Sequence, residues 1–204
     1  MRDRGDGHQG GRRLRGAALS LLMAVGCARP SPSRQPSGPE GFSSPQRIVS
    51  MTPALTEILF ALGLGEKVVG VTDYCDHPPE AARRSRIGGY VNPSVEGILG
   101  LHPDLVLVSP AAGNREAATA VRRAGVRLEV IPAETLSEAF EAIESVARIC
   151  GAEERGRKLL QSLQERIEAA ASKVRSLPRV RTLFCLQIDP LIAAGRGTLP
   201  SELL

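Results

Sequence analysis

The hydrophobic pattern of residues 47–79 predicts a strand–helix–strand unit. Residues 47–50 form a short β-prone run, and apolar side chains then recur at helical spacing at Leu55, Ile58, Leu59 and Leu62. A second β-prone run follows, with Val68, Val69 and Val71. The loop 72–79 comes directly after it, at the carboxyl end of the predicted strand. In open parallel α/β sheets, ligands bind at that edge.

Strands and helices continue to alternate up to residue 150. Residues 104–109 are almost continuously apolar, as expected for a strand that is covered on both faces. Asn114 is predicted to cap a helix that ends at Gly125, and residues 127–131 form the next strand. This alternation predicts βαβ units and a parallel sheet, so the fold class is α/β and residues 47–150 form one lobe.

Several helix ends carry recognisable signals. Thr52 suits an N-cap, and Pro53 suits the first helical position, where its missing N–H costs nothing. Gly63 and Gly65 suit the end of the same helix. Thr135-Leu136-Ser137-Glu138 is a capping box, which predicts a further helix starting there.

The pattern changes after residue 150. Residues 153–175 contain no proline and a single glycine, and a narrow apolar stripe recurs through Leu160, Leu163, Ile167, Ala170 and Val174. They predict one helix of about 34 Å at about 1.5 Å per residue. We interpret residues 151–177 as a bridge between two lobes, with a coiled-coil dimer segment as the alternative. Residues 178–204, with a strand predicted at 180–186 and a helix opening at 199, begin a second α/β lobe. A truncated chain or an incomplete gene model is expected.

The charge of the chain is concentrated at its N-terminus. Of 26 basic and 22 acidic residues, 21 basic and 20 acidic remain outside residues 1–26, which leaves a net charge of +1. This balance provides no electrostatic surface for nucleic acid, so no nucleic-acid partner is expected. The composition, with 42% hydrophobic and 24% charged residues, is that of a globular protein.

Residues 1–26 are predicted to be a signal peptide, because an arginine-rich segment precedes the short apolar segment 16–26. Ala24-Val25-Gly26-Cys27 resembles the lipobox of bacterial lipoproteins, in which the cysteine carries the lipid. The match departs from the family at Ala24, where leucine is preferred. Residues 27–46 are rich in proline and serine and read as a tether. A lipid anchor at Cys27 on the extracytoplasmic side of the membrane is expected, with a free cysteine beside an ordinary cleavage site as the alternative.

The order and spacing of three motifs resemble the substrate-binding proteins of ABC importers for vitamin B12, iron-siderophores and haem. The motifs are RIVSMTPALTEILFALGLGEKVVGVTDYCDHPPEA, then GYVNPSVE from Gly89, then LHPDLVL from Leu101. The resemblance runs from about residue 47 to residue 204. It implies two α/β lobes joined by a rigid helix, a ligand held in the cleft between them, and no enzymatic activity. On this resemblance, most of the C-terminal lobe is expected to be missing from the sequence.

Within that family the loop TDYCDHPPEA is most similar to the cobalamin-binding receptors. The resemblance implies ligand contacts from Tyr74, Tyr90 and Asn114, and a macrocyclic ligand, cobalamin or a related corrinoid. Rigid aromatic faces suit a flat, mostly apolar macrocycle. Cobalamin receptors can present a tryptophan in the loop 109–114, and this chain has none. A ferric siderophore or haem is the alternative ligand, and each tyrosine has the alternative of being an ordinary surface or half-buried residue.

The resemblance also implies the partners, an ABC permease and its ATPase. In the family a glutamate of each lobe docks on arginines of the permease, and Glu96 is the match in this lobe; the alternative is an ordinary solvated glutamate. A monomer is expected. The alternative from a different functional class is that the chain is a structural or interaction lipoprotein and takes no part in transport.

The remaining polar residues predict no catalytic or metal site. Outside residues 1–26 the only histidines are His77 and His102, which is too few for a closed zinc site. No phosphate-binding loop, GxSxG motif or catalytic triad is recognisable, so no enzyme and no cofactor are expected. Cys150 and Cys185 fall on apolar faces and are predicted to be buried, whereas Cys75 is predicted to be exposed in its loop.

Overall fold

The computed structural model describes residues 44–204, so the expected signal peptide, Cys27 and the tether up to residue 43 lie outside the described residues. The strands are β1 (Ile48–Ser50), β2 (Val68–Val71), β3 (Ser85–Arg86), β4 (Leu105–Val108), β5 (Leu128–Val130), β6 (Cys185–Gln187) and β7 (Ile192–Ala193). The α-helices are α1 (Pro53–Ala61), α2 (Val95–Gly100), α3 (Arg115–Arg123), α4 (Leu136–Cys150), α5 (Glu153–Val174) and α6 (Leu199–Leu203). Short 3-10 helices lie at Gly65–Lys67, Ala81–Arg83 and Ala112–Asn114.

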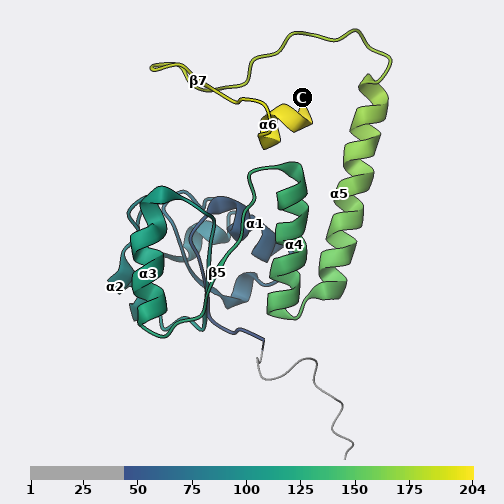
Figure 1. Cartoon of the computed structure of the whole chain (residues 1–204). Coiled ribbons are helices and arrows are strands. Elements are labelled where there is room, and N and C mark those ends of the chain that lie inside the picture. The colour runs from purple at the N-terminus through teal and green to yellow at the C-terminus, as the bar shows by residue number, and fades with distance from the viewer. Residues whose placement is uncertain (1–43) are drawn as a thin grey trace, which may run out of the picture. The chain divides into compact units, whose positions relative to one another are not determined.

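The first five strands form one parallel sheet in the order β3-β2-β1-β4-β5, which confirms the predicted α/β fold. Alternate side chains of each strand leave opposite faces of the sheet, and both faces are covered. Ile48 belongs to a core shared with α1 and α4, whereas Val49 belongs to a core shared with α2 and α3. All of β4 is buried, as its continuous apolarity predicted. Figure 1 shows the two helix pairs on opposite sides of the sheet.

The order of the strands contains one topological switch point. From β1 the chain passes to β2 and β3 on one side, and then crosses β1 to continue with β4 and β5 on the other side. The segments that leave β1 and β4 therefore diverge at the carboxyl edge of the sheet. A crevice forms at such a point, and it is where ligands bind in open α/β sheets.

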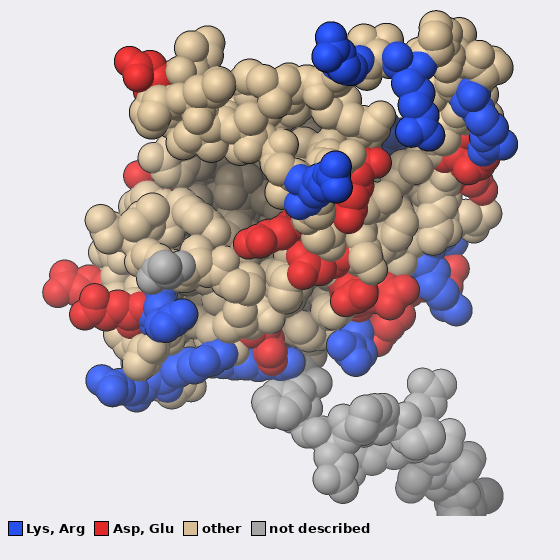
Figure 2. Space-filling model, turned by 45° about the horizontal axis from the view of Figure 1, so that its top comes forward, with Lys and Arg blue, Asp and Glu red and all other residues tan. Residues whose placement is uncertain are grey.

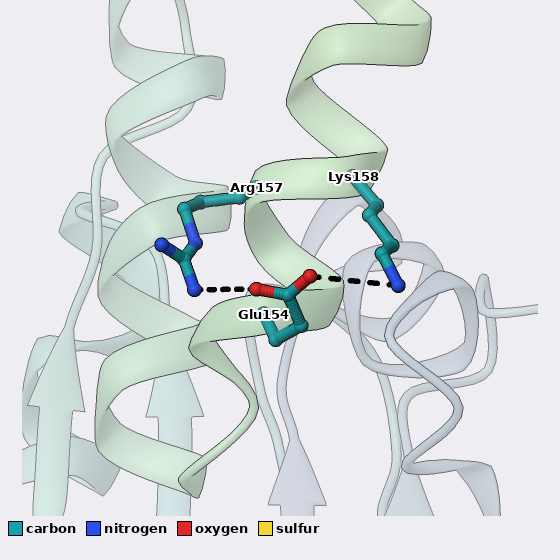
Figure 3. A network of polar contacts seen from close by, with 3 residues as sticks. All are labelled: Glu154, Arg157 and Lys158. Carbon is teal, nitrogen blue, oxygen red and sulfur yellow. Dashed lines mark hydrogen bonds and ion pairs between the residues drawn. The ribbon is translucent and has the colours of Figure 1, made fainter.

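The long helix α5 is continuous over 22 residues, as predicted, and lies along α4 in its first half (Figure 1). Gly156 makes close packing possible, because a Cβ at this position would lie 2.7 Å from the Cβ of Ala147. Gly156 and Leu160 are buried, whereas Val174 near the other end is 58% exposed. Figure 3 shows Glu154, in the first turn of α5, between Arg157 and Lys158. Glu154 forms an ion pair with each of them, and because both pairs are exposed they contribute little to stability.

The region after α5 differs from the sequence prediction. The strand predicted at residues 180–186 is wrong, because β6 spans only Cys185–Gln187 and pairs antiparallel with β7. A β-prone run becomes a strand only where a partner strand is available. Within the described residues β7 is the only strand that pairs with β6. Cys185 is exposed, so its predicted burial is also wrong.

The glycines after α1 have separate roles. Gly63 takes a left-handed conformation, with φ of 66°, directly after the C-cap residue Leu62. Gly65 has no positive φ and instead begins the short 3-10 helix that leads into β2. The prediction that both glycines end α1 is therefore correct for Gly63 and wrong for Gly65.

The contact between α4 and α5 yields a stability prediction. Gly156→Val should lower the free energy of unfolding by about 2 kcal/mol or more, because the added side chain must push α5 away from Ala147. Ala169→Val is the matched control, since Ala169 is exposed on the same helix and the new side chain meets solvent. Urea unfolding followed by circular dichroism measures both. Equal losses in the two variants would contradict the packing role of Gly156.

Candidate functional site

The carboxyl edge of the sheet is hollowed. The hollow has a volume of about 580 Å³ and is lined by residues 52–54, Tyr74, residues 90–91, Ser109 and residues 133–134. These five segments follow β1, β2, β3, β4 and β5 in turn. Because all five strands are parallel, their carboxyl ends meet at one edge, and segments far apart in the sequence build one site around the switch point.

Tyr74 reaches the hollow from a loop whose backbone and neighbouring residues are held by hydrogen bonds. Cys75 is fully buried, so its predicted exposure is wrong. Its sulfur lies 3.2 Å from Oγ1 of Thr56 and 3.1 Å from Oγ1 of Thr72. Arg86 donates hydrogen bonds to the carbonyls of Thr72, at 2.6 Å, and Cys75, at 3.1 Å. The loop is thereby anchored at two successive points, while the side chain of Tyr74 is 65% exposed and faces the hollow.

Tyr90 and Val91 reach the same hollow from the segment after β3. A backbone hydrogen bond of 3.0 Å from the Asp73 amide to the Gly88 carbonyl ties this segment to the Tyr74 loop. On its other side the segment packs closely on Gly113, where a Cβ would lie 2.3 Å from Cγ1 of Val91. The absence of a side chain at Gly113 therefore allows the loops after β3 and β4 to touch.

Asn114 does not line this hollow. Its side chain is 3% exposed, and its Nδ2 donates a hydrogen bond of 3.2 Å to the carbonyl of Ser109. Asn114 stands at the N-cap position of α3, as predicted, but its side chain makes no capping hydrogen bond. The contact with the hollow from this loop comes from Ser109 instead. Sequence reasoning missed Ser109, although its place directly after β4 was a usable signal.

Thr52 also differs in detail from the sequence prediction. It occupies the N-cap position of α1, ahead of Pro53, but its hydroxyl makes no capping hydrogen bond. Its Oγ1 lies 3.3 Å from Oγ of Ser109, across the switch point between β1 and β4. Thr52 and Ser109 are thus polar lining residues of the hollow.

The electrostatics of the hollow depend on Tyr90 and Glu134. Burial, and secondarily the negative charge of Glu134, raise the pKa of the Tyr90 hydroxyl above its usual value. The phenol therefore stays protonated and neutral at physiological pH. It can donate a hydrogen bond to a ligand, and it is a poor source of phenolate. Figure 2 shows a hollow bordered largely by uncharged residues, with acidic side chains beside it.

The segment that contains α6 meets the rim of the hollow. The Leu199 amide donates a hydrogen bond of 2.9 Å to the carbonyl of Glu134. The Leu136 amide, in the first turn of α4, donates one of 2.6 Å to Oε2 of Glu202. The capping box at Thr135 and Glu138 forms as predicted, so two carboxylates satisfy the N-terminus of α4.

Glu96 lies outside the hollow. It is exposed in the first turn of α2, where a carboxylate is favourable to the helix dipole. Ser94 caps the same helix by accepting the amide of Gly97 at 3.0 Å. The position leaves the carboxylate of Glu96 accessible to another molecule.

The described cysteines are unpaired and have different surroundings. Cys75, Cys150 and Cys185 are all free thiols. Cys150 is buried, as predicted, and burial raises the pKa of its thiol to about 11. It therefore remains protonated at physiological pH and acts as a small apolar residue. Within residues 44–204 no three His, Cys, Asp or Glu side chains converge as a metal site would require.

Comparison with known protein families shows the family to which the chain belongs. Residues 48–204 match the family model described as periplasmic binding protein, so the chain belongs to the periplasmic binding protein family. The family consists of binding proteins that work outside the cytoplasm, and not of enzymes. Within residues 44–204, no helix has both the length and the apolar character needed to cross a membrane.

Two relatives by sequence are informative. The vitamin B12-binding protein of Vibrio cholerae is 31% identical over 157 residues, which are 77% of this chain and 57% of that protein. An uncharacterized ABC transporter substrate-binding lipoprotein of Bacillus subtilis is 32% identical over 168 residues, covering 78% of this chain and 53% of the relative. The chain thus spans just over half the length of the relatives that it matches.

Two solved structures of binding proteins for different ligands resemble the chain with the same TM-score. The periplasmic vitamin B12 binding protein BtuF of Vibrio cholerae has a TM-score of 0.69 at 31% identity, covering 78% of this chain and 62% of that one. The periplasmic haem-binding protein RhuT from Roseiflexus sp. RS-1 has a TM-score of 0.69 at 35% identity, with the same coverage. The comparisons define the family, and the solved structures with which this chain shares its fold include proteins named for two different macrocycles.

Proposed function

We propose that this chain provides the N-terminal lobe and connecting helix of an ABC-importer substrate-binding protein whose ligand is cobalamin or a related corrinoid. The observation that carries the proposal is the convergence of five post-strand segments on one hollow that has two tyrosines in its lining. Aromatic faces provide a large, rigid contact area for a flat macrocycle. The similarity to vitamin B12-binding proteins supports the same ligand class.

In this proposal residues 47–150 form the binding lobe and residues 151–177 the bridge to a second lobe, of which residues 178–204 are the beginning. The continuous helix α5 supports the bridge, because its far half is not buried against the first lobe. The apolar side chains exposed after it support a second lobe, since a globular domain would bury them: Leu183, Phe184, Leu186, Ile188, Leu191 and Ile192.

Haem is the second candidate ligand, and a specific observation favours it. The haem-binding protein RhuT resembles this chain as closely as BtuF does, by TM-score. A ferric siderophore is the third candidate ligand, which the sequence also left open.

Ligand binding can be tested by calorimetric titration of the protein with cyanocobalamin. We expect a micromolar or weaker dissociation constant, because one lobe buries less of a large ligand than a closed cleft does. Tyr74→Ala and Tyr90→Ala should each weaken binding by about tenfold, since each removes a rigid aromatic contact. Phe184→Ala is the control, because Phe184 is an exposed aromatic outside the hollow. Tighter binding of haem or a ferric chelate than of cyanocobalamin would replace the corrinoid.

We further propose that Glu96 docks on a basic surface of the permease, which works with its ATPase. The carboxylate is exposed on α2 and away from the hollow, so docking and ligand binding use separate surfaces. The charge reversal Glu96→Arg should abolish stimulation of the permease–ATPase complex reconstituted in liposomes, and leave cyanocobalamin binding unchanged. Glu116→Arg provides the matched control, because Glu116 is also exposed in the first turn of a helix. Full stimulation by the Glu96→Arg variant would remove this assignment.

Finally, we propose that the protein is anchored in the membrane by a lipid on Cys27, and that it acts as a monomer. The lipobox-like sequence before Cys27 and the lipoprotein named among the relatives support the anchor. Cys27→Ala should move the protein from the membrane fraction to the soluble extracytoplasmic fraction, as measured by immunoblotting after cell fractionation. An unchanged membrane fraction in that variant would contradict lipidation at Cys27.

A further inference from the structure

Glu134 differs from every other residue of the hollow. Of the nine side chains that line the hollow within residues 44–204, only that of Glu134 carries a charge. The others are apolar or neutral polar, and none of them is lysine, arginine or histidine. A ligand in this hollow therefore meets one negative charge and no positive one from the lining.

The position of Glu134 is fixed by its backbone. Its amide donates a hydrogen bond of 2.8 Å to Oε2 of Glu138, as part of the N-terminal cap of α4. Its carbonyl accepts the hydrogen bond from Leu199. The backbone of Glu134 is thus held on both sides of its Cα, in the segment that follows β5. The carboxylate is carried by a fixed part of the rim.

Among residues 44–204 no basic side chain neutralises the charge of Glu134. Within the described part of the chain, its carboxylate forms no ion pair with a basic side chain. The charge acts on the hollow, because it contributes to the raised pKa of Tyr90. A free carboxylate accepts hydrogen bonds from N–H donors and repels other carboxylates.

Resting on the proposed function, we propose that Glu134 is a specificity-determining residue of the hollow. It favours a macrocycle whose rim carries neutral amide N–H donors and disfavours one whose rim carries carboxylates. The rim of a corrinoid such as cobalamin consists of carboxamides, whereas haem carries two propionate carboxylates. Glu134 therefore discriminates between the two macrocycles by rim charge, independently of their shared flat shape.

Probes that differ in one group isolate this effect. Cyanocobalamin can be compared with the three derivatives in which one of its peripheral propionamides is hydrolysed to a carboxylate. The protein should bind at least one of these acids about tenfold more weakly than cyanocobalamin, because an added like charge faces Glu134 across a partly screened site. Glu134→Gln should reduce that difference to about twofold or less, since glutamine keeps the size and hydrogen-bonding capacity without the charge.

Glu144→Gln is the matched control. Glu144 is an exposed acid on α4 that lies outside the hollow, and its loss changes the net charge of the protein by the same amount. This variant should keep the discrimination of the unaltered protein. Raising the salt concentration should weaken the discrimination in the unaltered protein and leave that of Glu134→Gln unchanged.

The outcomes separate this inference from the proposed function. If the unaltered protein binds cyanocobalamin and Glu134→Gln keeps the same discrimination against every acid, the role of Glu134 is wrong and the corrinoid proposal stands. If the unaltered protein binds all three acids as tightly as cyanocobalamin, the role of Glu134 is likewise wrong. If the protein binds no corrinoid probe, or binds haem in preference, the corrinoid proposal and the role of Glu134 are both wrong.

Discussion

The parallel pairing of β1 with both β2 and β4 is the constraint on which the rest of the structure depends. It places the fully buried strand β1 at the centre of the sheet, with Ile48 and Val49 fully covered by helices on opposite faces. Because every strand runs in the same direction, every following loop emerges at the same edge. The crossover from one side of β1 to the other then opens the hollow that Thr52 and Ser109 help to line.

Buried hydroxyl groups make that edge rigid. Ser50, Thr56 and Thr72 are fully buried, and an unpaired polar group in such a place would be costly. Their oxygens are paired, with Thr56 Oγ1 at 2.8 Å from Ser50 Oγ and near the sulfur of Cys75. The network connects the end of β1 to the loop after β2. An exposed aromatic side chain such as Tyr74 can thus be presented from a loop without being mobile at its base.

Much of this arrangement could be predicted from the sequence. The strand order within each βαβ unit, the capping box at Thr135 and the extent of α5 all follow from local spacing, and the structure contains them. The resemblance to the family also selected Tyr74 and Tyr90, which the structure places after β2 and β3 at the same hollow. Asn114 is not among the residues that line the hollow, because its side chain instead donates a hydrogen bond to Ser109 of its own loop.

The sequence by itself therefore determined most of the elements up to residue 174, their order and the parallel direction of the sheet, because hydrophobic period and capping residues act over a few positions. It did not determine which loop residues face inward. The burial of Cys75, the exposure of Cys185 and the place of Glu134 at the rim were decided only by the tertiary structure. Each depends on contacts between segments separated by many residues, such as Arg86 with the Tyr74 loop and Leu199 with Glu134.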